Sequence, residues 1–569
     1  MGGNIMKTGR KVLTTILATT TFATTLAGCG SNTMTSTTTT VTTETTTTTG
    51  SSYKSLNSSK GTSIFSDETA ACAEAPASAV TENCYSYDSA MCGTEKYCWD
   101  NDEKVINSES YTQPEENGFF ITAAEPLSTF AADVDTASYS NVRRMIEDGY
   151  RLSQINTDAV RAEEFINYFS YDLNSPKAGE KFGITTEIAT CPWNTDHQLM
   201  FVGMKTQDID FREAPRSNLV FLIDVSGSME YSNKLPLLQA SFKELVDSLP
   251  NNGTVSIVTY SGEERVVLSG ESMRNKGKIK SAIDSLVASG CTNGEAGMKK
   301  AYQIAADNFI EGGNNRVIMA TDGDLNVGIS STKELEKFIK TKKDDGIFLS
   351  VLGFGTGNLK DDKMQTLADC GNGNYSYIDS LFEGKKVLVD ELGSTLVTVA
   401  KDVKLQVEFN PAKVNAYRLI GYENRIMDAM DFNDDTKDGG EMGAGHSIVA
   451  LYEIIPEGSA SAISLKYQEN KEADYSNEYA TVSVRYKEPD RDKSQLFDVV
   501  VTDESVTSEA SDNLKFAGMV AEFAMILSDS DHKGDSSLEY IMATYKTLEG
   551  TDEYQDEFNQ LVRMVAKRG

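Results

Sequence analysis

The stretch "NLVFLIDVSGSME" (Asn218–Glu230) joins a run of strand-forming apolar residues to an abrupt polar turn. Such an apolar run is typical of a strand buried on both faces, as in a parallel sheet. It ends at Asp224, and Ser226 and Ser228 follow at alternate positions. Alternate side chains of an extended segment point to the same side, and Gly227 lets the backbone turn sharply between them. The stretch therefore predicts an oxygen-rich site at the end of a buried strand.

Strands and helices alternate downstream of this stretch. The segment "LPLLQASFKELVDSLP" is amphipathic, because its apolar side chains fall on one helical face: Leu235, Leu238, Phe242, Leu245 and Leu249. Further apolar strands are expected within 254–260, 316–324, 347–355 and 375–379, with helices between them. This order predicts an α/β fold with a doubly wound, mostly parallel sheet, in which ligands bind beyond the carboxyl ends of the strands. We expect the last helix of this domain to run to about Ala400.

Two later loops should end at the same edge of the sheet as the opening motif. "SGCTNGEAG" carries Thr292, and "ATDGD" carries Asp322. With Asp224 and the two serines they offer two carboxylates and three hydroxyls, an all-oxygen set that suits a hard cation such as Mg²⁺, with Mn²⁺ or Ca²⁺ as alternatives. If the hydroxyls bind directly and the carboxylates act largely through water, the cation keeps most of its positive charge and requires an external anionic ligand.

This pattern of Asp-x-Ser-x-Ser, a later Thr in a Gly-rich loop and a Thr-Asp-Gly on a following strand resembles the metal-ion-dependent adhesion site of von Willebrand factor A domains. The resemblance implies that Ser226, Ser228 and Thr292 bind the metal directly, while Asp224 and Asp322 act mainly through water. A domain that has kept these loops and binds no metal is the alternative.

The flanking sequence extends the resemblance from Pro126 to the C-terminus. "STFAADVDTASYSNVRRMI", "CPWN", "VEFNPAKVNAYRLIGYENR" and "DFNDDTKDGGEMGAGH" resemble the bacterial YfbK-like lipoproteins. The expected organisation is a signal peptide (1–29), a Thr/Ser-rich linker with a cysteine cluster (30–115), an N-terminal von Willebrand factor-associated domain (116–215), the A domain (216–400) and a C-terminal domain, β-rich and then helical (401–569). We expect strands before Asn218 to pair with strands after Lys401.

The N-terminus has the features of an export signal. A basic start is followed by an apolar stretch, too short to span a bilayer, that ends in "LAGC" at Cys29. Small residues before a cysteine resemble the bacterial lipobox, which predicts lipidation of Cys29 and an extracytoplasmic, membrane-anchored protein; an ordinary signal peptide is the alternative. In the linker, two disulfides are favoured over zinc or free thiols, with the connectivity left open among Cys72, Cys84, Cys92 and Cys98.

Composition and the lack of certain catalytic motifs argue against several classes of function. With 53 basic and 85 acidic residues the formal net charge is -32, which disfavours nucleic acid. The chain has three histidines, none in an H-E-x-x-H pattern, and Ser226 lies in no G-x-S-x-G turn. We therefore expect a metal-dependent module that binds a protein partner through an acidic side chain of that partner. We do not expect the protein to be an enzyme. A structural envelope protein with metal-independent contacts is the alternative, and a hydrolase is less favoured.

Four further features are expected to be structural. "DVDTAS" (133–138) precedes a helix and predicts a cap and a solvated turn. "DFNDDTKDGG" departs from a calcium loop at Thr436 and Met442 and predicts a surface turn. "GFGTGN" (353–358) is expected to be a turn at a strand end. The isolated cysteines are expected to be structural: Cys191, Cys291 and Cys370.

Overall fold

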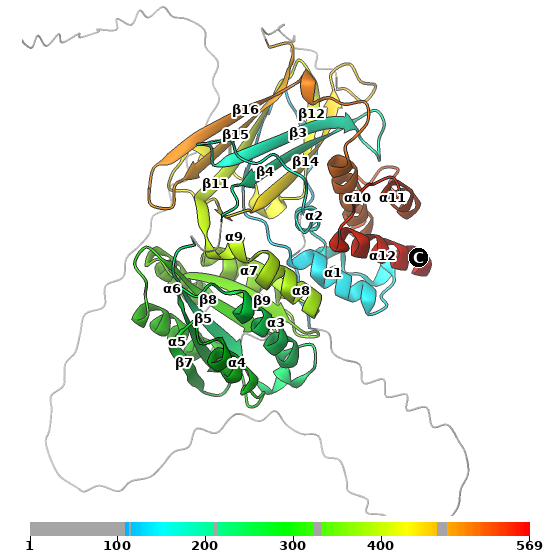
Figure 1. Ribbon diagram of the computed structural model, residues 1–569. Helices are drawn as coiled ribbons and strands as arrows, with labels where there is room; N and C mark the ends of the chain where they lie inside the picture. The colour runs from blue at the N-terminus through cyan, green and yellow to red at the C-terminus, as the bar shows by residue number, and fades with distance from the viewer. Residues whose placement is uncertain (1–107, 113–114, 210–213, 324–331, 464–474) are drawn as a thin grey trace, which may run out of the picture. The chain divides into compact units, whose positions relative to one another are not determined.

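The computed structural model describes residues 108–112, 115–209, 214–323, 332–463 and 475–569. Cys29 and the cysteine cluster of the linker lie outside these residues. The described part of the chain forms three β-sheets with helices packed on them (Figure 1). None of its helices combines the length and the apolar character that crossing a bilayer requires.

The middle of the chain forms an α/β domain around a six-stranded sheet. Across the sheet the strands are β10 (Tyr375–Ile378), β9 (Phe348–Phe354), β8 (Asn314–Thr321), β5 (Ser217–Asp224), β6 (Thr254–Tyr260) and β7 (Glu264–Ser272). All neighbouring pairs are parallel except β6 and β7. The helices of this domain that precede its last one are α3 (Leu235–Ser248), α4 (Lys276–Asp284), α5 (Gly294–Asp307), α6 (Thr332–Asp344) and α7 (Asp361–Cys370).

The central strand β5 is buried on both faces. Phe221 packs against Phe242 of α3, with ring centroids 4.7 Å apart. The next residue, Leu222, belongs to a second core that contains Met298 of α5 and Met364 of α7. Because successive strand residues point to opposite faces, each face of the sheet is covered by helices. The doubly wound fold expected from the sequence is confirmed.

The flanking segments form two antiparallel sheets. One has the order β1 (Phe120–Ile121), β12 (Val414–Ile420), β14 (Ser447–Pro456), β4 (Gln198–Thr206) and β3 (Phe182–Thr190). The other has β13 (Gly440–Gly443), β11 (Thr398–Phe409), β15 (Glu478–Lys487) and β16 (Ser494–Thr502), and β2 (Leu127–Ala131) also pairs with β11. In both sheets, strands from before the α/β domain pair with strands from after it, as expected: Val202 of β4 lies opposite Ala450 of β14.

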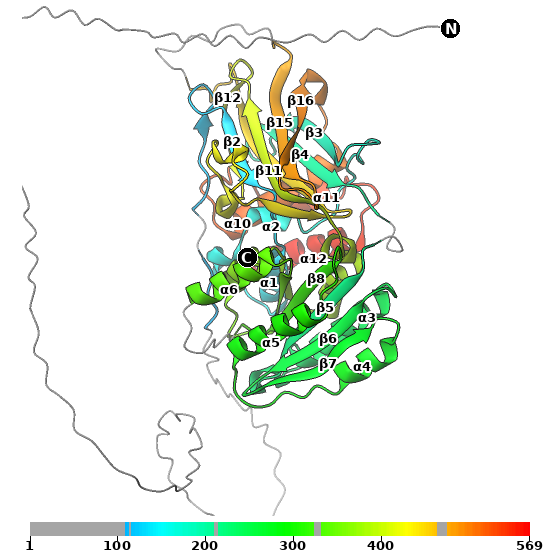
Figure 2. The ribbon, with the colours of Figure 1, turned by 90° about the vertical axis from the view of Figure 1, so that its left-hand side faces the viewer.

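Five helices cover the outer face of the first of these sheets: α1 (Ala137–Glu147), α2 (Ala162–Ile166), α10 (Asp512–Leu527), α11 (Leu538–Tyr545) and α12 (Glu553–Arg568). Val449 and Leu451 of β14 belong to the core shared with these helices. Ile448 and Ala450 belong instead to the core between the two sheets. The flanking region is therefore layered as helices, sheet and sheet. In Figure 1, α10 and α11 lie on one side of the strands, and Figure 2 looks at the strands from the opposite side.

Three arginines with little or no exposure to solvent join the α/β domain to its flanks. Arg143 of α1, 2% exposed, lies 2.6 Å from Asp379 and 2.8 Å from Glu383. Arg161 lies 2.9 Å from Asp361 at the start of α7, and Arg425 lies 3.0 Å from Asp369 at its end. Each arginine belongs to a flanking segment and each carboxylate to the α/β domain, so the two parts are held by charge-assisted hydrogen bonds.

The "DVDTAS" segment takes part in this junction, and the expected solvated turn is wrong. Asp135 is 2% exposed, accepts a hydrogen bond from the backbone N–H of Tyr375 at 2.7 Å and lies 3.1 Å from Arg425. Thr136 occupies the N-cap position of α1 without a side-chain capping bond. The turn is buried because β10 and Arg425 supply the partners that water would otherwise provide.

The last helix of the α/β domain ends earlier than expected and is broken. It consists of α8 (Leu381–Lys385), a π-helical turn (Lys386–Asp390) and α9 (Leu392–Leu396), and β11 already begins at Thr398. The run Val397, Thr398 and Val399 is β-branched and favours a strand, while Gly393 weakens the helix before it. We refer to residues 387–397 as the connecting segment.

Candidate functional site

Asp224 ends β5 between its neighbours β6 and β8, with 0% of its surface exposed. Its carboxylate accepts a hydrogen bond from the backbone N–H of Ser226 at 2.8 Å and one from the hydroxyl of Thr321 at 3.3 Å. These bonds fix the carboxylate at the carboxyl edge of the sheet, where the sequence predicted it. Burial raises the pKa of Asp224 to about 6.

The serine hydroxyls lie side by side. Ser226 Oγ and Ser228 Oγ are 3.1 Å apart, with Ser226 buried and Ser228 partly exposed. Adjacent ligands of an octahedral Mg²⁺ with bonds of 2.0–2.1 Å are separated by about 3 Å. The spacing of the two hydroxyls therefore fits two neighbouring positions around such an ion.

The loop that carries Thr292 is held against the serine loop. Gly227 N donates to Gly290 O at 3.0 Å, and Ser289 N donates to Val225 O at 2.7 Å. Thr292 follows two residues after Gly290, is partly exposed and stands just before helix α5. The structure thus brings the predicted Thr292 loop to the same edge of the sheet as the serine loop.

Asp322 follows β8 and is fully buried. Lys234 Nζ, itself 6% exposed, lies 2.8 Å from Asp322 Oδ2 and 3.3 Å from Asn358 Oδ1. Burial alone would raise the pKa of Asp322, but the Lys234 ammonium and hydrogen bonds, including one from Ser228, outweigh it and hold this pKa below its usual value. The carboxylate is therefore ionised and already has one cationic neighbour.

Lys234 is the site residue that the sequence did not predict. It stands just before α3, where a lysine is ordinarily solvated, and no spacing rule connects it to Asp322. Its stem passes Gly355, where an added Cβ would meet Lys234 Cε at 2.3 Å. Gly355 has φ +75°, which favours glycine, and the absence of a side chain there leaves room for the buried lysine.

The side chains gathered at this edge fit a divalent cation of the hard class. The donors are carboxylate and hydroxyl oxygens, as Mg²⁺ and Mn²⁺ prefer. Within the part of the chain that the structure describes, no group of three or more His, Cys, Asp or Glu side chains comes together in a way that could hold a metal ion. A metal site at this edge would therefore depend on the serine and threonine hydroxyls. The Lys234 ammonium beside Asp322 also reduces the net negative charge of this edge.

The histidines lie elsewhere. His197 Nδ1 is 2.5 Å from Glu453 in the flanking region, and His446 and His532 also belong to flanking segments. Cys191 and Cys370 are buried, as a structural role requires, and Cys291 is exposed in the loop beside Thr292. Residues 431–438 form the expected surface turn, and β9 ends at Phe354 just before the turn expected there.

Three family models match consecutive parts of the chain. "von Willebrand factor" matches residues 105–201, "von Willebrand factor type A domain" matches residues 218–391, and "Uncharacterized protein YfbK, C-terminal" matches residues 394–567. The second match spans the six-stranded sheet with its carboxyl edge, and the other two span the flanking sheets and helices. A von Willebrand factor type A domain indicates an interaction or adhesion role.

Individual proteins agree with these matches. The "Uncharacterized protein YfbK" of Escherichia coli (strain K12) is 41% identical over 468 residues, which cover 80% of each chain. A solved von Willebrand factor type A protein from Catenulispora acidiphila covers 69% of this chain and 91% of its own, with 14% identity and a TM-score of 0.38. Proximal thread matrix protein 1 from the mussel byssus, solved "with zinc occupied MIDAS motif", covers 33% of this chain and 46% of its own, with 23% identity and a TM-score of 0.27. From the identity and coverage of the first of these relatives, this chain belongs to the YfbK family of von Willebrand factor type A domain proteins.

Proposed function

We propose that the edge formed by Asp224, Ser226, Ser228, Thr292 and Asp322 binds a divalent cation, most simply Mg²⁺, and that this edge captures a protein partner through an acidic side chain. The observation that carries the proposal is the pair of serine hydroxyls 3.1 Å apart, next to the buried carboxylates of Asp224 and Asp322. A bound cation would act as an electrophile for a carboxylate oxygen. The side chains of this chain supply the remaining ligands and hold them in place.

The charge balance favours an anionic partner group. The two carboxylates contribute two negative charges, and the Lys234 ammonium beside Asp322 cancels part of them. A divalent cation in this setting carries surplus positive charge, because the hydroxyl ligands are neutral. A carboxylate from outside satisfies that charge and gains strength from the low-dielectric surroundings of the buried edge.

We propose binding without catalysis. In the described residues the three histidines lie in the flanking segments, so none supplies a general base beside Ser226 or Ser228. The buried Lys234 ammonium is engaged by Asp322. The edge therefore offers ligands and charge, and these suit recognition.

We also propose that Cys29 carries a lipid and that the folded part is displayed outside the cytoplasm. The "LAGC" sequence after an apolar stretch supports this proposal. A receptor of this kind, joined to the membrane by a Thr/Ser-rich linker, would be able to reach partners at a distance from the bilayer surface.

Calorimetric titration of the whole chain with Mg²⁺ tests the metal proposal. We expect binding by the parent chain and loss of binding in Asp224→Ala and in Asp322→Ala. Asp247→Ala, which removes an exposed carboxylate of α3, is the matched control and should bind as the parent does. Equal affinity in all four proteins would refute the metal site.

Capture of proteins from the envelope of the source organism tests the partner proposal. We expect captured proteins that are lost with EDTA, restored by Mg²⁺ and absent with Asp224→Ala. Capture that is the same with EDTA would favour the alternative, an envelope-organising protein with metal-independent contacts. One observation supports that alternative: Phe120, Leu127 and Ile426 are exposed around a groove of about 360 Å³ in the flanking region.

A further inference from the structure

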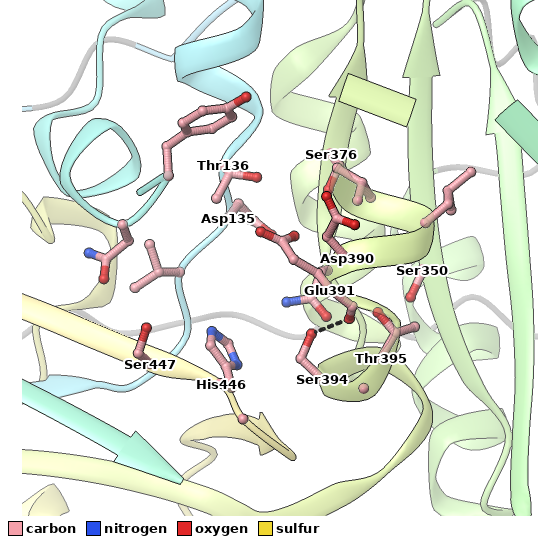
Figure 3. A pocket seen from close by; sticks show the side chains of 18 of the residues that line it. Asp135, Thr136, Ser350, Ser376, Asp390, Glu391, Ser394, Thr395, His446 and Ser447 are labelled. Atoms are coloured by element: carbon pink, nitrogen blue, oxygen red, sulfur yellow. Dashed lines mark hydrogen bonds between the residues drawn. The ribbon is translucent and has the colours of Figure 1, made fainter. Parts of the chain in front are cut away.

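A second cavity, of about 300 Å³, lies where the connecting segment packs between the α/β domain and the flanking region (Figure 3). Its wall draws on three parts of the chain: residues 134–136 and 167–170 before the α/β domain, β8, β9 and β10 within it, and residues 444–447 after it. The connecting segment contributes residues 387–395. This volume falls at the lower end of the range of small-molecule sites.

The polar wall of the cavity is rich in negative charge and in hydrogen-bond acceptors. Four carboxylates line it: Asp135, Asp208, Asp390 and Glu391. Among the described residues that line the cavity there is no lysine or arginine. Burial lowers the pKa of His446, so its ring is neutral near pH 7 and one ring nitrogen can accept a hydrogen bond. Figure 3 shows His446 on one wall and Asp390 and Glu391 on another, around the same space.

Asp390 is the carboxylate whose charge is least compensated. Its partner is the neutral phenol of Tyr554, which donates to it at 2.8 Å. Glu391, in contrast, pairs with Lys386, and Asp135 pairs with Arg425. Asp390 is also exposed, so it stands where a solute would enter from solvent.

The other wall of the cavity is apolar. Ile318 of β8, Leu352 of β9, and Val387 and Leu388 of the connecting segment line it, and all four side chains are buried. An apolar surface next to the Asp390 carboxylate, which has no cationic partner within the described part of the chain, suits an amphiphilic solute with a hydrocarbon body and a charged donor group. Anions are disfavoured, because each lining carboxylate would repel them.

We infer that this cavity binds a small organic cation, an ammonium or amidinium group on an apolar body, with the charged group on Asp390 and the body on Val387 and Leu388. The bound solute contacts the connecting segment, which joins the α/β domain to β11. Binding therefore stabilises one arrangement of that segment relative to both domains. The cavity is separate from the proposed metal edge and shares none of its residues.

Three compounds of one shape test the ligand class: benzamidine, benzamide and benzoate. Titrations of the whole chain are done with EDTA present, so the outcome does not depend on the proposed metal site. We expect benzamidine to bind and the neutral and anionic analogues to bind at least about tenfold more weakly, because a charge-assisted hydrogen bond is lost. No heat with benzamidine, or equal binding of the three compounds, would overturn the inference.

Variants locate the binding. Asp390→Asn removes the charge and keeps the shape, and should weaken benzamidine about tenfold or more. Asp345→Asn, an exposed carboxylate after α6, and Asp224→Ala at the metal edge should both bind benzamidine as the parent does. Benzamidine should also slow hydrogen exchange in residues 387–395. Unchanged affinity in Asp390→Asn, or unchanged exchange in those residues, would show that the compound binds elsewhere and would overturn the assignment.

Discussion

Lys234 Nζ lies 2.8 Å from Asp322 Oδ2, and both side chains are buried at the carboxyl edge of the central sheet. An ammonium at this point opposes a dication electrostatically, while it stabilises the carboxylate when no metal is bound. The same lysine therefore affects the affinity for the metal and the stability of the metal-free protein in opposite directions.

Lys234→Met should raise the affinity for Mg²⁺ about tenfold, because a neighbouring positive charge is removed. In EDTA the variant should be less stable by about 3 kcal/mol, because Asp322 is left buried without its cationic partner. Calorimetry with Mg²⁺ and thermal unfolding in EDTA measure the two effects. Lys243→Met, which changes an exposed ion pair of α3, is the control. Weaker Mg²⁺ binding in Lys234→Met would contradict the opposing role of the ammonium.

Thr292→Ala should weaken partner capture more than Mg²⁺ binding. The threonine hydroxyl is one neutral ligand among several, so its loss should reduce Mg²⁺ affinity by about threefold and capture by about tenfold. Calorimetry gives the first value, and quantified capture at saturating Mg²⁺ gives the second. Ser289→Ala in the same loop is the control. Equal losses in both measurements would assign Thr292 to metal binding alone.

Arg143→Met should destabilise the junction between the α/β domain and its flanks by about 3–5 kcal/mol, because Asp379 and Glu383 would remain buried without their guanidinium partner. Thermal unfolding should show a clear fall in Tm. Arg563→Met is the control, because it makes the same substitution on the exposed face of α12, away from the junction. A variant as stable as this control would mean that the junction does not depend on the arginine.

Glu522 of α10 predicts a dependence of stability on pH. Burial raises the pKa of Glu522 from 4.5 to about 8, against a smaller effect of the Ser536 hydroxyl. Between these two pKa values the folded state holds one more proton than the unfolded state. The contribution of the protonated Glu522 side chain to stability is therefore complete below about pH 4.5 and is lost as the pH rises through about 8. Glu522→Gln should therefore lose less Tm than the parent between pH 6 and pH 9. Glu539→Gln, exposed on α11, should follow the parent, and parallel curves for all three proteins would contradict the assignment.

Cys29→Ser should release the protein from membranes, because the proposed lipid has one attachment point. Cells expressing the variant are fractionated, and the protein is followed in the membrane and soluble fractions. Cys291→Ser removes an exposed thiol of the α/β domain and should remain with the membranes. Sedimentation of Cys29→Ser with membranes would exclude the lipobox.

The features that could be predicted from the sequence are those that depend on the local pattern of apolar and polar residues. Alternate positions in an extended segment placed Asp224, Ser226 and Ser228 together, and the order of strands and helices gave the doubly wound sheet. Contacts between segments far apart in the chain could not be predicted, because no periodic pattern in the sequence connects their residues. Lys234 reaches Asp322 from the start of a helix, and Arg143 reaches Asp379 from another domain.

The end of the last helix was missed for a related reason. Residues 397–399 are β-branched and favour a strand, and β11 forms there by pairing with β13 and β15, which both lie later in the chain. The buried turn at Asp135 shows the same limit, because the partners that bury it are Tyr375 and Arg425, both far along the chain.

The pairing of β4 with β14 has a consequence for the order of folding. Lys205 lies opposite Ser447, so strand β4 has no partner from the later part of the chain until the whole α/β domain has been made. The α/β domain itself is formed from one continuous stretch and contains mostly local strand-helix-strand contacts, which form faster than distant ones. We expect it to fold first and to bring its two ends together, so that the flanking sheets close last. Refolding followed by a probe at Trp193, in the core of the helices and β4, should therefore be slower than refolding of the central sheet.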